Sequence, residues 1–445
     1  MRNINNEKRI ISEESNGVTR IYPDDDKEKV VRKKKKKSKN KNKNTAPFSS
    51  KILILAVAAI LLLVFLLANG ASGGFVSTVN GKMVAALTKN SVDEFDYSVD
   101  AENIYAFSSN KDGFVLLADA EIAFTDASGE IFARQQHSYS NPVLVQRDNR
   151  CMIFDKGEST YSLMKNMSLV SQQSVNEDII NAAISSKSNY AIAVREKDSA
   201  KCILYGFNGN GKLIYQWNCT NGYIADVAMN DSGSKVAVTV INAENAVLCS
   251  SVYVLDFEYD TAYAQFDYAD ETVIGTKFLS DKKIQVVTDK RLYLISAKEQ
   301  EVVYEYDSAD IAYANVTEDA YTAVVTKSYV HDDSYTLSVF TSSGKLKYSV
   351  ELTGEVCGLD SSNKSIAVLF NDKTETYSSS GKLVGTTTGL HYYKDIVING
   401  NYLFVLSSDS VKKCTAYGNY EAVYNYGYDD TADDAVVDYF EDETV

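Results

Sequence analysis

A polar turn that closes on glycine recurs along the larger, C-terminal part of this sequence, and it limits the fold more than any other feature. Glycine supplies the positive φ that tight hairpin turns require, and each copy lies between two short apolar segments. The four clearest copies are TDASGEIFA at 125–133, FNGNGKLIY at 207–215, FTSSGKLKY at 340–348 and YSSSGKLVG at 377–385. Their glycines (Gly129, Gly211, Gly344 and Gly381) are 82, 133 and 37 residues apart, close to two, three and one units of about 40 residues.

Weaker copies of the same turn fill the gaps in this period. They join two apolar segments through a polar bend near residues 166, 260, 299 and 419, which brings the expected number of hairpins to eight. Another pair of short apolar strands lies ahead of most hairpins, so one unit holds four strands in about 40 residues, the period of a β-propeller. Runs such as Ala237-Val238 and Ala323-Val324-Val325 do not alternate with polar residues, as expected for a blade covered on both faces.

We therefore predict an all-β fold with one β-propeller at residues 75–428, of eight blades, with seven as the alternative count. A β-sandwich array and a solenoid are the competing architectures. Residues 75–100, including KMVAALT at 82–88, are expected to supply a strand that completes the last blade and closes the ring. Residues 429–445 hold eight acidic residues and no basic one, which predicts a disordered, solvated tail. Calcium binding there is the alternative, although no DxDxDG loop is present.

Residues 51–69 are predicted to form a single transmembrane helix. The stretch KILILAVAAILLLVFLLA at 51–68 has seventeen uncharged, mostly aliphatic residues behind one lysine. At about 1.5 Å per residue it spans ~26 Å, close to the ~30 Å hydrocarbon core of a bilayer. A short linker at 70–74 is expected to follow. A cleaved signal peptide is the alternative, but the ~50 residues before the apolar stretch are more than such a peptide normally has.

Residues 1–50 are predicted to be a disordered basic tail. The first 51 residues carry 16 Lys or Arg and 7 Asp or Glu, whereas the remainder carries 29 and 53, which gives net charges of +9 and −24. The positive-inside rule then places the N-terminus in the cytoplasm and the large domain outside, as in a single-pass type II membrane protein. The basic cluster is also expected to contact anionic lipid of the inner leaflet. It consists of Arg32, Lys33, Lys34, Lys35, Lys36, Lys37, Lys39, Lys41 and Lys43. No nucleic-acid binding is expected, because the cluster lacks interleaved aromatic residues.

Three short segments add a resemblance to a known family: GGFVS at 73–77, MNDSGSKVAV at 229–238 and SSVYVLDF at 250–257. Together with the basic tail and the single anchor, they resemble the single-pass membrane proteins of Gram-positive bacteria grouped as domain of unknown function 5711. The resemblance covers about residues 50–425 and rests on strand patterns and turn glycines. It implies a β-propeller-like ectodomain at the cell membrane and brings no catalytic motif with it.

The sequence contains no recognisable catalytic motif. Its three histidines, His137, His331 and His391, fall on different expected blades, and no HExxH, GxSxG or P-loop pattern occurs. Paired carboxylates on the propeller top are the alternative for catalysis, because blades bring distant residues together there. FNGNGKLIYQW at 207–217 is similar to the blade motif of quinoprotein propellers, but those repeat the tryptophan and Trp217 is the only one here. We therefore expect no enzymatic activity, no cofactor and no metal, and a core position for Trp217 between blades.

Cys202 and Cys219 are predicted to lie opposite each other in the third blade. If Asn210-Gly211 forms a two-residue type I′ turn, residues whose numbers sum to 421 face one another, and a disulfide becomes geometrically possible. A three-residue turn would break this register. Two small buried thiols are the alternative in a reducing compartment. The absence of any CxxC pair among the six cysteines argues against a structural zinc site.

These features predict a membrane-anchored, extracytoplasmic β-propeller that acts as a binding module for an unknown protein, peptide or cell-wall polymer. The first alternative is a transmembrane sensor or scaffold whose basic tail engages a cytoplasmic partner, with Arg20-Ile21-Tyr22-Pro23 as its only plausible docking segment. A propeller-fold enzyme is the second alternative. No pattern in the sequence identifies the ligand.

Overall fold

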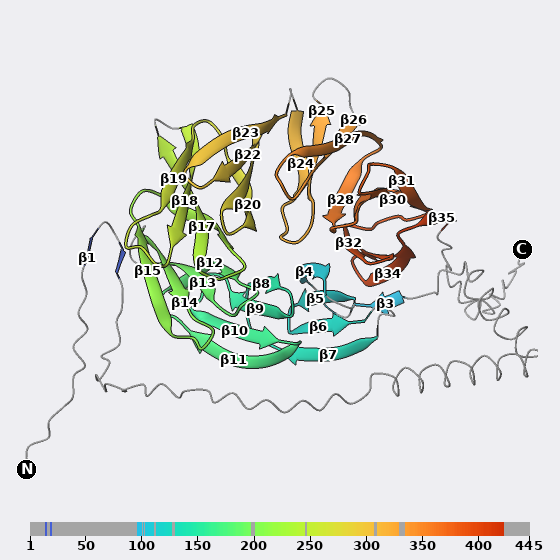
Figure 1. Ribbon diagram of the computed structural model, residues 1–445. Coiled ribbons are helices and arrows are strands. Elements are labelled where there is room, and N and C mark those ends of the chain that lie inside the picture. Colours follow the sequence, from blue (N-terminus) through green and yellow to red (C-terminus); the bar gives the residue numbers. More distant parts are fainter. Residues whose placement is uncertain are drawn as a thin grey trace, which may run out of the picture. The chain divides into compact units, whose positions relative to one another are not determined.

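The described residues form an eight-bladed β-propeller (Figure 1). The computed structural model describes residues 14–15, 18–19, 96–99, 101, 103–110, 113–126, 130–196, 201–244, 247–306, 309–328 and 334–421. Each blade contains an antiparallel sheet of four strands. The first strand lies beside the central channel and the fourth lies at the rim of the ring. The predicted all-β fold and the count of eight blades are confirmed.

Blades A to G each take four consecutive strands from the chain. Blades A to D consist of β4–β7 (Ile104–Ser109, Phe114–Ala118, Glu121–Thr125, Ile131–Gln136), β8–β11 (Pro142–Arg147, Arg150–Asp155, Thr160–Lys165, Ser168–Ser174), β12–β15 (Asp178–Ile184, Tyr190–Arg195, Cys202–Phe207, Leu213–Cys219) and β16–β19 (Tyr223–Met229, Lys235–Glu244, Val247–Asp256, Ala264–Tyr268). Blades E to G consist of β20–β23 (Val273–Ser280, Lys283–Thr288, Arg291–Ser296, Glu299–Glu305), β24–β27 (Ala309–Asn315, Thr322–Ser328, Ser334–Phe340, Leu346–Thr353) and β28–β31 (Val356–Ser361, Ser365–Phe370, Lys373–Ser378, Leu383–Thr388).

Blade H closes the ring with strands from both ends of the propeller. Its three inner strands, β32 (Asp395–Asn399), β33 (Tyr402–Leu406) and β34 (Ser410–Thr415), come from the C-terminal part, and β3 (Asp96–Ser98) pairs with β34 as the outer strand. This confirms the expectation that residues 75–100 supply the closing strand, although the segment 82–88 lies outside the described residues. Because the two ends of the propeller share blade H, the ring has no gap, and every blade packs against a neighbour on each side.

The eighth predicted hairpin, near residue 419, is wrong. The place beside β34 is already taken by β3, so the chain after β34 crosses to blade G, where β35 (Gly418–Glu421) pairs in parallel with β31. A Cβ on Gly385 of β31 would lie 2.3 Å from the carbonyl oxygen of Ala416, so only glycine lets the crossing chain approach this closely. The other seven predicted hairpins are the third and fourth strands of blades A to G.

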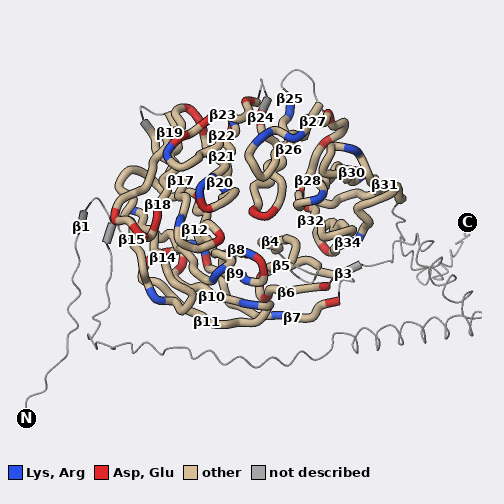
Figure 2. The backbone as a smooth tube through the Cα atoms, viewed as in Figure 1, with Lys and Arg blue, Asp and Glu red and all other residues tan. Residues whose placement is uncertain are grey.

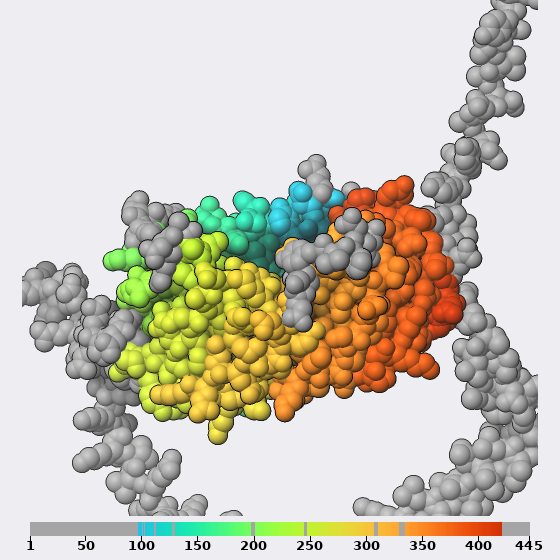
Figure 3. Space-filling model, turned by 90° about the horizontal axis from the view of Figure 1, so that it is seen from above, coloured from blue at the N-terminus to red at the C-terminus, as the bar shows by residue number. Residues whose placement is uncertain are grey.

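Each of the eight seams between neighbouring blades holds its own cluster of buried apolar side chains. The second strands lie between two seams and are buried along their length, as in β5 and β29, whereas the outer strand β7 alternates between half-buried and exposed. This explains why apolar runs such as those in β17 and β25 do not alternate. Figure 3 views the ring from its rim, where neighbouring blades pack directly against one another.

Two faces of the ring carry different loops. The turns between the first and second strands of a blade, and between its third and fourth strands, lie on one face, which we call the hairpin face. The turns between second and third strands and the links from blade to blade lie on the other, which we call the connection face. β3 runs antiparallel to β34, with Asp96 opposite Lys412 and Ser98 opposite Ser410, so the chain enters the propeller at the hairpin face of blade H.

Gly381, one of the four turn glycines, is constrained both by its backbone and by a neighbour. Its φ is +81°, and a Cβ there would lie 2.8 Å from the ring of Tyr348 on the neighbouring blade. We expect Gly381→Ala to lower the free energy of unfolding by about 2 kcal/mol, since it adds a clash to the backbone strain. Gly400 is the matched control, because its φ is +60° but nothing lies within 4 Å. Urea denaturation that finds equal losses for Gly381→Ala and Gly400→Ala would contradict the role of Tyr348.

The N-terminal residues contribute two short strands. β1 (Glu14–Ser15) pairs with β2 (Val18–Thr19), and β2 pairs with the outer strand β15 of blade C, so that this sheet has six strands. The predicted transmembrane segment 51–69, the linker 70–74 and the acidic tail 429–445 lie outside the described residues, as do the outer ends of the predicted 75–428 domain. Within the described part of the chain, no helix is long and apolar enough to span a membrane.

Candidate functional sites in the channel and on blade D

Six of the eight inner strands contain a β-bulge close to their first residue. The extra residues are Tyr105, Ile180, Ala225, Ile274, Ala312 and Cys357, and each directly follows an isoleucine or a valine. A bulge bends its strand and re-aims the side chains that follow it. The bulges therefore change which side chains these six inner strands direct toward the channel. The Ile or Val that precedes each bulge recurs in the sequence and could have predicted the bulges, which the spacing of the turns does not predict.

Polar side chains around the channel join one blade to the next. Among the described residues, a hydrogen bond that involves a side chain crosses seven of the eight seams close to the inner strands. The bonds are Gln146 Nε2 to Ser109 O (2.5 Å), Asn181 Nδ2 to Ala225 O (3.0 Å), Thr276 Oγ1 to Asp226 Oδ2 (3.4 Å), Lys277 Nζ to Ala320 O (2.9 Å), Asn315 Nδ2 to Asp360 Oδ1 (2.8 Å), Ile398 N to Asp360 Oδ2 (2.8 Å) and Asn399 Nδ2 to Gly113 O (2.7 Å). These hydrogen bonds pair polar groups that would otherwise lack partners at the inner strands, and they stabilise the ring.

Asp360 links three blades at once. Its carboxylate accepts hydrogen bonds from Asn315 of blade F, from Ile398 N of blade H and from Ser361 N of its own strand. Although part of its surface is accessible, protein surrounds the carboxylate, and this desolvation raises the pKa of Asp360 to about 7. Burial also raises the pKa of Asp395, on the inner strand of blade H, to about 6.

The stability that Asp360 contributes to the propeller should therefore fall as pH rises from about 4 to 7. Because the folded-state pKa of Asp360 lies above the value near 4 expected in the unfolded chain, the folded state binds the proton more tightly. The stabilisation is complete below the unfolded pKa and is lost as pH rises through 7, by at most about 4 kcal/mol for a shift of this size. Urea denaturation of Asp360→Asn across this range should give a flatter profile, whereas the exposed Asp270→Asn should keep the natural one. Parallel profiles for all three proteins would contradict the assignment.

Arg147, at the end of the inner strand of blade B, brings charges from two other blades into the channel. Its side chain is only 5% exposed and forms ion pairs with Asp231 of blade D and Glu318 of blade F, and its Nε lies 3.5 Å from Asp319. Glu318 and Asp319 belong to the loop at residues 316–321, between β24 and β25, which we call the plug loop. In Figure 1 this loop reaches from β24 toward the middle of the ring, and Figure 2 shows acidic residues at its tip. Blades B and F are four blades apart, so the loop crosses the channel.

The base of the plug loop is held by both neighbouring blades. Lys277 of blade E is 2% exposed and donates to the carbonyl oxygens of Thr317 and Ala320, and its burial lowers the pKa of the amine to about 8. On the other side, Ser361 of blade G donates to Tyr321 O at 2.6 Å. The charged residues at the hairpin-face mouth of the channel thus bind one another rather than facing an open site.

The longest hairpin of the propeller projects from the connection face of blade D. Its strands β17 and β18 have ten residues each, and they continue beyond the strands on both flanks. β16 pairs with β17 only as far as Ile241, and β19 pairs with β18 only from Ser250 onward. Among the described residues, 242–244 and 247–249 therefore pair only with each other and offer two unpaired strand edges.

One side of this hairpin carries exposed apolar residues that continue onto blade E. Leu248 is 59% exposed and, by strand alternation, lies on the same side as Ser250, whose hydroxyl accepts a hydrogen bond from Val273 N of blade E. Ile274, the bulged residue that follows Val273, is 44% exposed. Tyr223 and Ala243 are exposed on the same side, as their pairing with Ile241 and Leu248 shows. We call Tyr223, Ala243, Leu248 and Ile274 the ledge.

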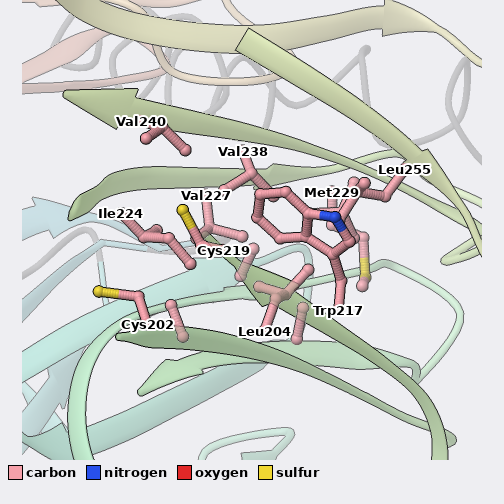
Figure 4. Packing of buried hydrophobic residues seen from close by; sticks show 14 of the residues in the cluster. Cys202, Leu204, Trp217, Cys219, Ile224, Val227, Met229, Val238, Val240 and Leu255 are labelled. Carbon is pink, nitrogen blue, oxygen red and sulfur yellow. The ribbon is translucent and has the colours of Figure 1, made fainter. Parts of the chain in front are cut away.

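Cys202 and Cys219 lie directly opposite each other on β14 and β15, so the predicted register is right. The predicted two-residue turn is wrong: Asn208 N donates to Lys212 O and Gly211 N to Asn208 O, and a bulge between Gly206 and Phe207 restores the register that this longer turn would shift. Both thiols are free and buried, and burial raises their pKa values, that of Cys219 to about 11. Figure 4 shows their sulfur atoms pointing apart within the cluster between blades C and D. The disulfide itself stays a prediction.

The other residues that the sequence singled out are separated or not described. The nine basic residues from Arg32 to Lys43 and His331 lie outside the described residues. His137 follows the outer strand of blade A, stacks on Tyr139 and has its pKa lowered by burial, whereas His391 lies in the link before blade H. Trp217 packs against Tyr253 of the next blade with ring centroids 5.0 Å apart, which confirms its core position. No group of His, Cys, Asp and Glu suited to a metal ion occurs among the described residues.

Comparisons with known proteins agree with this architecture. The C-terminal WD40 domain of Sif2 matches with a TM-score of 0.53 at 13% sequence identity, over 72% of this chain and 98% of that domain. BamB from Moraxella catarrhalis matches with a TM-score of 0.46 at 13% identity, over 72% and 95% of the two chains. At such identities these likenesses concern the fold alone. No curated protein matches the sequence. A family model described as "Family of unknown function (DUF5711)" matches residues 88–413.

Proposed function

The chain belongs to the DUF5711 family of unknown function, because the family model matches most of the chain, residues 88–413. From this premise we propose that the protein is a membrane-anchored interaction module. Its propeller binds a protein partner through the ledge on blade D, outside the membrane, and carries out no chemistry. The observation that carries the proposal is the ledge itself, with exposed fractions of 41% for Tyr223, 59% for Leu248 and 44% for Ile274.

A polypeptide is the partner that the ledge fits best. Contiguous exposed apolar side chains mark interaction sites more often than they occur by chance on a soluble surface. The unpaired edges at 242–244 and 247–249 offer backbone donors and acceptors beside these side chains, so an extended peptide can satisfy both. The sugar rings of a wall polymer would leave the strand edges unmatched. The polar residues of the channel, in contrast, are used in bonds between blades.

The proposed location outside the membrane is supported by the sequence. Residues 51–68 are long and apolar enough to span a bilayer, and the charge difference between the two sides follows the positive-inside rule. Within one chain this topology excludes the pairing of β2 with β15, because residues 18–19 and the propeller would lie on opposite sides. The two arrangements are alternatives, and the location of the tail decides between them.

A photo-crosslinking amino acid placed at Leu248 in living cells tests the proposed function. We expect a discrete crosslinked band that contains this chain and one protein partner. Val170, which is 63% exposed on the outer strand of blade B, is the matched control position and should give no such band. The double variant Leu248→Asp with Ile274→Asp should lose the partner while keeping the unfolding midpoint. A crosslink of equal strength from Val170, or none from Leu248, would overturn the proposal.

A further inference from the structure

Blades F and G carry an exposed basic and apolar surface on the hairpin face. The turns between their third and fourth strands have the same sequence, Ser-Gly-Lys-Leu, at 343–346 and 380–383. Lys345 and Lys382 are exposed at the turn tips, and the adjacent Leu346 and Leu383 are 41% and 45% exposed. A third exposed lysine, Lys364, lies in the turn between the first two strands of blade G. We call these five residues the lysine turns.

No free carboxylate offsets this charge among the described hairpin-face turns of blades F and G. The acidic residues there are Glu318 and Asp319 of the plug loop, and both lie against the guanidinium of Arg147. Blades D and E differ, since Glu258, Asp260, Asp281 and Glu299 are exposed on their turns of the same face. The basic surface is therefore local to one sector of the ring, and Figure 2 shows basic segments beside the labels β27, β28 and β30.

The position of this sector relative to the chain's entry point indicates what it contacts. The chain enters at the hairpin face of blade H, with Asp96 opposite Lys412, and blade G is its direct neighbour. Only 27 residues, 69–95, separate the apolar stretch from this entry. Because a chain reaches at most about 3.5 Å per residue, so short a tether confines the entry point, and with it the neighbouring lysine turns, to the vicinity of the bilayer surface.

We infer that the lysine turns rest on the surface of the membrane and bind anionic lipid headgroups, an inference that depends on the proposed anchor. A lysine near an anionic bilayer contributes about 1 kcal/mol, so three give about 3 kcal/mol, and leucines beside them enter the interface. Exposed acidic residues of the connection face, such as Glu158 and Asp270, lie about 20 Å away across a six-residue strand, more than two Debye lengths in physiological salt, so they hardly weaken the attraction. Those on the hairpin face, such as Glu258 and Asp281, belong to blades D and E, outside this sector. The ledge, on the connection face, is then directed away from the membrane toward its partner.

Hydrogen exchange of the full-length protein in lipid nanodiscs tests this inference. In discs that contain phosphatidylglycerol, the amides of the two Ser-Gly-Lys-Leu turns should exchange several-fold more slowly than in discs of phosphatidylcholine alone. The triple variant Lys345→Glu, Lys364→Glu, Lys382→Glu should lose this protection. The matched control, Lys187→Glu, Lys282→Glu, Lys298→Glu, reverses three exposed lysines on turns of blades C and E and should keep it.

Two further outcomes separate this inference from the proposed anchor. Equal exchange in both kinds of disc, or protection by soluble polyphosphate without lipid, would overturn the contact with headgroups while leaving the anchor intact. A chain that does not insert into discs would instead remove the anchor. Flotation with phosphatidylglycerol vesicles then decides on the lysine turns, because binding that the triple variant lacks supports them and its absence overturns them.

Discussion

Replacing Phe114 with alanine is expected to lower the free energy of unfolding by about 3 to 5 kcal/mol, the range for deleting a fully buried phenyl ring. Phe114 is 0% exposed at the seam where blade A meets blade H. Its ring centroid lies 5.0 Å from that of Phe404, 5.3 Å from that of Phe107 and 5.9 Å from that of Tyr97 on the closing strand β3. The substitution therefore leaves a cavity at the one seam that joins the two ends of the propeller.

Chemical denaturation measures this loss, and blade A supplies the control. Phe132 lies on the outer strand of the same blade and is 47% exposed, so Phe132→Ala should change the free energy of unfolding by less than about 0.5 kcal/mol. Equal effects of the two substitutions would show that the seam is not closed by this aromatic cluster.

Replacing Arg147 with methionine is expected to cost about 2 to 3 kcal/mol at neutral pH, because it leaves the mostly buried carboxylate of Glu318 without its cation. Asp231 and Asp319, in contrast, are 62% and 68% exposed and are screened by water. Asp231, Glu318 and Asp319 all lie against this guanidinium, whose side chain is 5% exposed. Without it the carboxylates repel one another across the channel mouth.

A double-mutant cycle separates the charge effect from lost packing. Adding Glu318→Gln to Arg147→Met removes one of the repelling charges and should recover part of the lost free energy, although Glu318→Gln alone should destabilise the natural protein. The plug loop would not be held by these ion pairs if Arg147→Met cost less than about 1 kcal/mol or if Glu318→Gln recovered none of that cost.

The repeat of turns made most of this fold predictable. Glycine at Gly211, Gly344 and Gly381 adopts a φ between +76° and +83°, which is the physical reason that these turns recur in the sequence. The eighth hairpin failed because sequence spacing shows where a chain turns but not which neighbour the next strand finds. Blade H had already been completed by β3, from the other end of the propeller.

The register between β14 and β15 was predicted correctly, although the turn that joins them was not. The predicted pairing of Cys202 with Cys219 depended on a two-residue turn. The actual turn is longer and would have shifted every pair by one position without the bulge opposite Gly206 and Phe207, where Ile214 is the extra residue. A bulge inside a strand has no reliable local signature in one hairpin. Across six inner strands, however, Ile or Val before the bulged residue is a repeat that a sequence can reveal.

The candidate sites could not be located from local patterns. Arg147 and Asp231 are 84 positions apart, and Glu318 lies on the opposite side of the ring, so only the closed fold brings them together. The lysines at the turn tips are visible in the sequence, but their common face follows from the propeller. The ledge likewise combines residues from blades D and E whose exposure depends on where the flanking strands end.

Cysteine accessibility in intact cells is the most direct test of the central claim, that the propeller functions outside a membrane that its N-terminal segment spans. Ser168→Cys places a thiol on an exposed position of blade B, and Ser38→Cys places one in the basic tail. A membrane-impermeant maleimide should label the first in intact cells and the second only after the membrane is permeabilised, with the natural protein as the background. Labelling of both thiols in intact cells would favour the β2–β15 pairing instead, and labelling of neither would place the propeller inside.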